Sequence, residues 1–173
     1  SDGRYEVSDF ESYNSTTDTW VLNPGVSDNS AITGKVRPGT LKLKDLVDDG
    51  NGLVDTKDLT IIGNVNPKCT GGFNISGRLY GFDLNAVFNY SIGNDVYNAN
   101  KIEYTTARYQ YRNMIDIMAS GKRWTNVDAD GNLVNDPAAL ESMNANTTMW
   151  SPYMTRHVLT DWAVEDGSFI RLK

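Results

Sequence analysis

The chain has 173 residues, enough for one domain with a modest hydrophobic core. Its formal net charge is −6, so we expect no binding to nucleic acid or to anionic lipid headgroups. No stretch approaches the roughly 20 consecutive apolar residues that a transmembrane helix needs.

The first 44 residues are rich in Ser, Thr, Asp and Gly and contain two strong turn signals, Asn23-Pro24-Gly25 and Arg37-Pro38-Gly39. The segments "TWVLNPGV" and "TLKLKDL" are typical of short strands. In the second segment, Leu41, Leu43 and Leu46 indicate a strand that stops at an acidic loop.

The acidic loop lies within "LVDDGNGLVDTKDLTIIGNVNP" and has two interpretations. If Gly52 is the sixth residue of a calcium loop, oxygen ligands fall at nearly all the required places: Asp49, Asn51, the Leu53 carbonyl, Asp55 and Asp58. However, the first place falls on Val47, which has no side-chain oxygen, and the flanks do not look helical. The alternative is a polar surface turn.

The clearest pattern runs over 67–92, where "GGFNISGRLYGFDLNAVFNYSI" alternates apolar and polar residues on both sides of Tyr80-Gly81. A two-residue turn there predicts a hairpin whose register places Ile75 opposite Ala86. The same register predicts three further pairs: Phe73 faces Phe88 and Leu79 faces Phe82 on the apolar side, and Arg78 faces Asp83 on the polar side.

Each predicted strand is about 11 or 12 residues long, whereas about 5–6 is usual in soluble sheets. A tilted strand that crosses a bilayer needs roughly 9–11 residues. Periodicity alone leaves both a soluble, half-buried hairpin and a membrane-spanning hairpin open.

Helical spacing follows in "NANKIEYTTARYQYRNMIDIMASGKRW". The apolar stripe predicts a helix over 98–121 and consists of Tyr104, Ala107, Tyr111, Met114, Ile115 and Met118. A short helix is predicted at "DPAALESMN", where Pro137 suits the first turn. The acidic run at 128–132 reads as an Asp-Gly turn. The final "SFIRLK" indicates the beginning of a strand, so we expect the chain to be a fragment.

Cysteine and histidine each occur once, as Cys69 and His157. A single cysteine excludes an internal disulfide and a multi-cysteine metal site. The two residues together allow a nucleophile–base pair, but no catalytic motif surrounds either of them, and no carboxylate pair is marked out for glycoside hydrolysis. We therefore do not expect an enzyme.

Several ordered motifs resemble the SusC/RagA class of TonB-linked outer-membrane transporters. The segment "RPGTLKLKDLVDDGNGLVDTKDLTIIGNVNPKCTGGFNISGRLYGFDL" is similar to a signature of that class, and "DGRYEVSDF", "YSIGNDVYN", "GKRWT" and "VEDGSFIRLK" follow the expected order. The acidic loop departs from the pattern by about two extra residues, which leaves Val47 where the first Asp usually stands.

The resemblance implies a mainly β fold: a long antiparallel hairpin from a transmembrane β-barrel, with long extracellular loops that contain one longer and one short helix. It assigns 1–66 to an extracellular loop region with short strands and the acidic loop, and 67–92 to the barrel hairpin. It assigns 93–167 to a second extracellular loop with a helix, and 168–173 to the start of the next barrel strand.

The resemblance also implies active import of glycans or peptides across the bacterial outer membrane. The implied partners are a SusD-like surface lipoprotein as lid and TonB, which would act through an N-terminal part outside this chain. Three loop tryptophans are candidates for stacking on a ligand, with structural packing as the alternative for each: Trp124, Trp150 and Trp162. A rival interpretation is a secreted, soluble carbohydrate-binding module with a calcium-binding loop.

Overall fold

The computed structural model describes residues 1–47, 49–109, 111–153 and 158–173. These residues form two compact units. The first, which we call the loop unit, comprises 1–60 and 100–159. The second, the hairpin unit, comprises 61–99 and 160–173. Each is described by itself.

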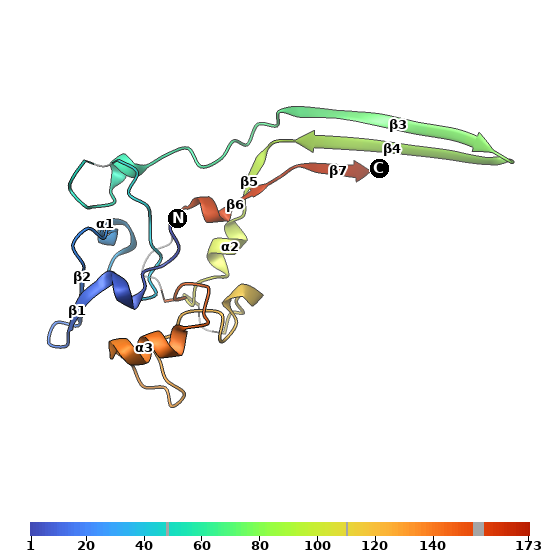
Figure 1. Ribbon diagram of the computed structural model, residues 1–173. Helices are drawn as coiled ribbons and strands as arrows, with labels where there is room; N and C mark the ends of the chain where they lie inside the picture. The colour runs from blue at the N-terminus through green and yellow to red at the C-terminus, as the bar shows by residue number, and fades with distance from the viewer. Residues whose placement is uncertain (48, 110, 154–157) are drawn as a thin grey trace. The chain divides into compact units, whose positions relative to one another are not determined.

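The described residues are mainly β. The strands and α-helices, labelled as in Figure 1, are β1 (Phe10–Asn14), β2 (Thr19–Leu22), α1 (Ser30–Thr33), β3 (Cys69–Leu79), β4 (Phe82–Ile92), β5 (Asp95–Tyr97), α2 (Ala99–Glu103), α3 (Pro137–Asn144), β6 (Val164–Asp166) and β7 (Phe169–Leu172). Short 3-10 turns lie at Val7–Asp9, Thr56–Asp58, Asp116–Met118 and Asp161–Ala163. No helix among the described residues is long and apolar enough to cross a membrane.

The hairpin register is confirmed over eleven residue pairs. Ile75 lies opposite Ala86, and the pairing runs without a bulge from one end of each strand to the other. The Phe73 and Phe88 rings stack with their centroids 4.8 Å apart. On the other face, the Arg78 guanidinium donates two hydrogen bonds to the Asp83 carboxylate, at 2.7 and 3.1 Å.

The two residues of the hairpin turn both have positive φ, 48° at Tyr80 and 85° at Gly81. This combination belongs to the type I′ turn, whose twist matches that of the flanking strands. The turn therefore fixes the same register that the alternating residues favour.

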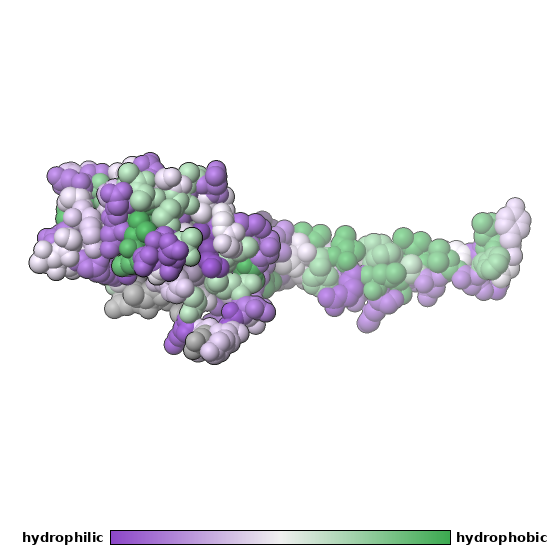
Figure 2. Space-filling view, turned by 90° about the horizontal axis from the view of Figure 1, so that it is seen from below, coloured by the Kyte–Doolittle hydropathy of each residue, from purple (hydrophilic) through white to green (hydrophobic). Residues whose placement is uncertain are grey.

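The apolar face of the hairpin is exposed along its length. Leu79 and Phe82 are 69% and 80% exposed, and several other large apolar residues of this face are exposed too: Phe73, Ile75 and Leu84. Figure 2 shows apolar and polar residues gathered on opposite sides of the extended hairpin. A soluble sheet buries such a face against a second layer, which the described part of this chain does not supply.

Strand β7 confirms the strand predicted at the end of the chain. It pairs with β4, and the three-stranded order is β3-β4-β7. Its pairing of Ile170 with Tyr90 and of Leu172 with Phe88 extends the apolar face. In the same unit, β5 pairs with β6, and the Asp95 carboxylate accepts a hydrogen bond from the Asn64 backbone N–H at 2.7 Å.

Most of the buried residues lie in the loop unit, among them Tyr5, Phe10, Leu41, Leu43, Val54, Met118, Trp124, Leu140 and Trp150. Strands β1 and β2 form a small hairpin. Burial of the Tyr5 ring raises the pKa of its hydroxyl to about 12, and that hydroxyl donates a 2.6 Å hydrogen bond to the Ser27 carbonyl. Helix α3 confirms the predicted short helix, with Pro137 in its first turn and Asp136 capping the Ala139 N–H.

The helix predicted over 98–121 is wrong. Only Ala99–Glu103 is α-helical, and among the described residues from there to Gly121 only Asp116–Met118 forms a further helical turn, of the 3-10 type. The backbone hydrogen bonds go elsewhere: the Ala107 N–H donates to Pro152, and the Ile115 N–H donates to Tyr104. The residues of the stripe thus lie in an irregular segment, where Met118 is buried and Tyr111 is exposed.

The strand predicted at "TLKLKDL" is also not formed as a regular element. Leu41 makes an isolated bridge with Arg4, and backbone hydrogen bonds join Lys42 to Asp2 and Gly3. Leu41 and Leu43 are buried, whereas Leu46 is exposed. The acidic run at 128–132 is a turn closed by the Asp128 carboxylate, as predicted.

Candidate ligand-binding pocket

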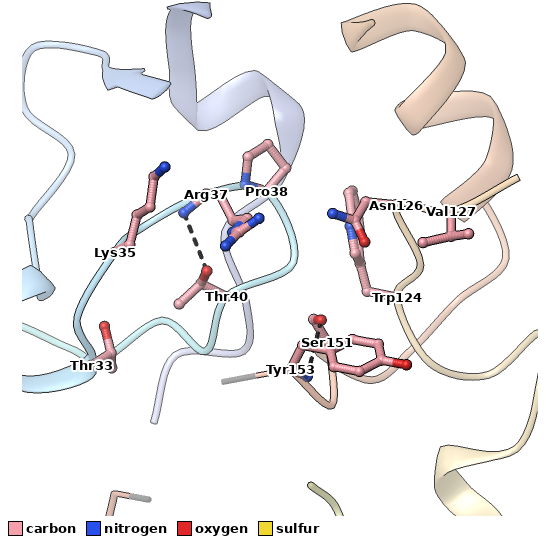
Figure 3. A pocket seen from close by; sticks show the side chains of 10 residues that line it. All are labelled: Thr33, Lys35, Arg37, Pro38, Thr40, Trp124, Asn126, Val127, Ser151 and Tyr153. Carbon is pink, nitrogen blue, oxygen red and sulfur yellow. Dashed lines mark hydrogen bonds between the residues drawn. The ribbon is translucent and has the colours of Figure 1, made fainter. Parts of the chain in front are cut away.

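A pocket of about 270 Å³ lies entirely within the loop unit (Figure 3). Three segments that are distant in sequence build it, at 33–40, 124–127 and 151–153. Its lining residues are Thr33, Lys35, Arg37, Pro38, Thr40, Trp124, Asn126, Val127, Ser151 and Tyr153.

The Arg37-Pro38-Gly39 turn forms one wall of the pocket. The Thr40 hydroxyl accepts a hydrogen bond from the Arg37 backbone N–H at 3.2 Å, and the Thr40 N–H donates back to the Arg37 carbonyl at 3.0 Å. The Gly39 carbonyl accepts from the Ser151 N–H at 2.8 Å, which joins this wall to the segment at 151–153. The turn predicted from sequence is therefore held by hydrogen bonds as part of the pocket wall.

Trp124 forms another wall of the pocket. It is 2% exposed, and the Arg4 guanidinium lies over its ring, 4.7 Å from the centroid. Arg4 also donates hydrogen bonds to Thr147 and to the Met149 carbonyl, so its position is fixed. Gly39 lies against the indole so closely that a Cβ there would be 2.2 Å from Cδ1 of Trp124.

The described charged residues that line the pocket are all basic. Two basic residues, Lys35 and Arg37, line it, and no acidic residue is among its described lining residues. The Lys35 ammonium forms an ion pair with Asp18 at 2.6 Å. The guanidinium of the half-buried Arg37 makes no ion pair or hydrogen bond with any residue that the structure describes, but its charge contributes, after that of Lys35, to lowering the pKa of Asp18. Arg37 and Asn126 lie on opposite sides of the pocket (Figure 3).

The three predicted tryptophans do not form one cluster. Trp124 and Trp150 are both buried in the loop unit, and only Trp124 lines the pocket. Trp162 is half-buried in the 3-10 turn of the hairpin unit. Stacking of a ligand on these rings stays a prediction. Sequence reasoning missed Arg37, Asn126 and Tyr153, because residues from three distant segments share no motif.

In the acidic loop, the predicted metal ligands contact the loop's own backbone. The Asp58 carboxylate accepts hydrogen bonds from the N–H groups of Leu46, Val47 and Asp55, each at 2.9 Å. These donors, that of Asp55 first, lower the pKa of Asp58 to about 2. Asn51 accepts from the Leu53 N–H at 2.6 Å.

The other carboxylates of the loop are engaged in the same way. Asp55 accepts from the Lys57 N–H, and the Lys57 ammonium pairs with Asp49 at 2.7 Å, which lowers the pKa of Asp49. Burial, followed by the charge of Asp58, raises the pKa of Asp45. Within the described ranges, no three His, Cys, Asp or Glu side chains are grouped so as to hold a metal ion. Calcium binding stays a prediction.

The residues considered for nucleophilic catalysis are not brought into a described site. Cys69 is exposed at the start of β3, and its sulfur lies 3.8 Å from the Tyr90 hydroxyl. His157 lies outside the described residues.

Comparison with known proteins gives one informative relative. Over 144 residues, 83% of this chain, the sequence is 33% identical to the TonB-dependent receptor P3 of Formosa agariphila. The chain covers 12% of the length of that relative. No protein-family model matches the sequence. The chain is thus similar to one short part of a TonB-dependent receptor.

Proposed function

We propose that this chain is a section of a TonB-dependent outer-membrane importer of the SusC/RagA type, which takes up glycans or peptides. Two independent observations support the proposal. One is the similarity to a TonB-dependent receptor over most of the chain. The other is the hairpin of two 11-residue strands with one largely exposed apolar face. Lipid covers such a face in a membrane β-barrel.

In this proposal the strands of 67–92 and 168–173 belong to the barrel wall, and Tyr80-Gly81 is a periplasmic turn. The segments 1–66 and 93–167 are extracellular, where they recognise the ligand and meet a SusD-like lipoprotein that acts as lid. TonB supplies the energy for import elsewhere in the longer protein. The chain itself makes and breaks no bond of the ligand.

The exposed apolar face is the observation that separates this proposal from a secreted, soluble module. A soluble protein rarely leaves a contiguous apolar patch of this kind without a partner. A bilayer, by contrast, removes all these side chains from water at once. In a barrel the alternating apolar residues face lipid and the polar residues between them face the interior.

Cysteine labelling in intact cells tests the proposed topology. In the longer receptor with Cys69→Ser, Asp130→Cys should react with a membrane-impermeant maleimide, because the turn at 128–132 faces outward. The matched variant Tyr80→Cys should react only after the cells are opened. Equal labelling of both in intact cells, or recovery of the protein in the culture medium, would contradict the proposal.

Import itself is tested by uptake of a fluorescent oligosaccharide or oligopeptide in cells with and without TonB. Uptake should require both the receptor and TonB. Deleting residues 98–121 is not a clean loop test, because Met118 is 0% exposed and belongs to the core of the loop unit. Tyr111→Ala is the better variant, since this side chain is 95% exposed and its loss leaves the core intact.

A further inference from the structure

We infer that the pocket beneath the Arg37-Pro38-Gly39 turn binds an acidic sugar, with Arg37 as the group that selects its carboxylate or sulfate. The inference rests on the proposed function for its biological setting, since an extracellular pocket of an importer is exposed to ligand. Its physical basis is the chemistry of the lining residues.

The first step concerns the unpaired charge. A guanidinium that is partly removed from water loses hydration free energy, and pairing with an anion offsets this loss. Lys35 has such a partner in Asp18, whereas Arg37 makes no ion pair with a described residue and acts on Asp18 only through its charge at longer range. Arginine presents a planar fork of N–H donors that matches a carboxylate or sulfate. An incoming anion is therefore the natural partner of Arg37.

The second step concerns the rest of the ligand. Across from Arg37, the Asn126 side-chain amide makes no hydrogen bond with a described residue and offers both a donor and an acceptor. Tyr153 is 71% exposed at the pocket and presents an aromatic ring with a hydroxyl. A sugar ring carries many hydroxyl groups and also has an apolar face. It therefore suits a pocket lined by amide, hydroxyl and aromatic groups.

The third step concerns size. Pockets that hold drug-sized ligands measure about 300–1,000 Å³, and this one measures about 270 Å³. It therefore suits one ring and its charged substituent. The lining also lacks a strand edge that would pair with a peptide backbone, since none of its residues belongs to a β-strand. This favours a sugar unit over a peptide.

Calorimetric titration tests the inference with three probes: glucuronate, glucose 6-sulfate and neutral glucose. The protein is kept in an uncharged detergent without a sugar headgroup, because a maltoside would compete for the pocket. We expect at least one acidic sugar to bind about tenfold or more tightly than glucose at low ionic strength, as hydrogen bonds to a charged group would give. The preference of sulfate over carboxylate, or the reverse, identifies the anion.

The variants assign the selection to Arg37. Arg37→Gln should reduce the preference for the acidic sugar to within about threefold of glucose, and Arg37→Lys should retain part of it because the charge remains without the fork. The control Lys35→Gln should keep most of the preference, since Lys35 already pairs with Asp18. Asn126→Ala should weaken acidic and neutral sugars alike.

Several results would overturn the inference: equal affinity for glucose and both acidic sugars, no binding of either acidic sugar at millimolar concentration, or an Arg37→Gln variant that selects as the parent does. Urea unfolding of each variant checks that it is folded. If Arg37→Gln is not folded, the loss of preference is measured with Arg37→Lys in its place. Cysteine labelling at positions 80 and 130 tests the proposed membrane topology without any ligand, so the two ideas fail by different experiments.

Discussion

A methyl group added at Gly39 should destabilise the loop unit more than the same change at a matched glycine. Gly39 has φ +86°, and its missing Cβ would lie 2.2 Å from Trp124 Cδ1. Gly25 has nearly the same backbone, φ +87°, but a Cβ there meets nothing within 4 Å. Both Gly39→Ala and Gly25→Ala incur the left-handed strain, about 1–2 kcal/mol, whereas only the first also overpacks a buried ring, at about 1–3 kcal/mol.

Urea unfolding followed by tryptophan fluorescence measures the difference. With a urea dependence of about 1–3 kcal/mol per molar for a small protein, we expect the unfolding midpoint of Gly39→Ala to lie about 1 M below that of Gly25→Ala. The clash itself is isolated by a double-mutant cycle with Trp124→Ala. In that background the indole is gone, so Gly39→Ala should cost no more than Gly25→Ala.

Equal midpoints for the two alanine variants in the parent background would refute this reasoning, because they would mean that Trp124 does not pack on the turn. The same result would mean that Trp124 does not form a wall of the proposed sugar pocket. An unchanged penalty for Gly39→Ala after Trp124→Ala would attribute the cost to the backbone alone.

Three further predictions concern the hairpin and the acidic loop. Ile75→Arg should reduce recovery of the longer receptor in the outer-membrane fraction, because a charge on the lipid face costs about 2–4 kcal/mol near the bilayer centre, whereas the neighbouring Asn74→Arg, on the opposite face, should not; equal recovery of both would contradict the assignment of faces. The Val47 amide proton should titrate by NMR with the pKa of Asp58, near 2; because this value lies below the ordinary 3.8, the stabilisation by these hydrogen bonds is present above about pH 4 and is lost as pH falls through 2, and Asp58→Asn should abolish the titration. Calcium should leave the melting temperature unchanged if the loop at 49–58 is a polar turn, as its internally bonded carboxylates lead us to expect, whereas a rise that a chelator reverses would establish the calcium site.

The hairpin could be predicted from the sequence because its information is local and repeated. Each strand alternates with period two, the turn has two residues, and pairs such as Ile75 with Ala86 agree with pairs such as Arg78 with Asp83 on the other face. An error of one residue would reverse both faces at once. Few registers satisfy so many conditions.

The irregular parts of the loop unit could not be predicted in the same way. The stripe from Tyr104 to Met118 has helical spacing, but the segment is held by distant groups, as the hydrogen bond from Ala107 to Pro152 shows. Buried Thr105 and Thr106 turn their hydroxyls back to the carbonyls of the short helix before them. Such side chains compete with a helical backbone. The pocket escaped prediction for a related reason, since its three segments meet only through tertiary contacts.

The order of the two units along the chain has a consequence for folding. The loop unit is discontinuous: its two halves are separated by about 40 residues of the hairpin unit. Once the hairpin has formed, the hydrogen bond between Asp95 N and Asn64 O brings the two ends of that insertion together. The remaining effective loop is about four times shorter, and its closure is easier by about 1 kcal/mol. Pairing of β3 with β4 therefore lowers the entropic cost of bringing together the two halves of the loop unit that enclose the pocket.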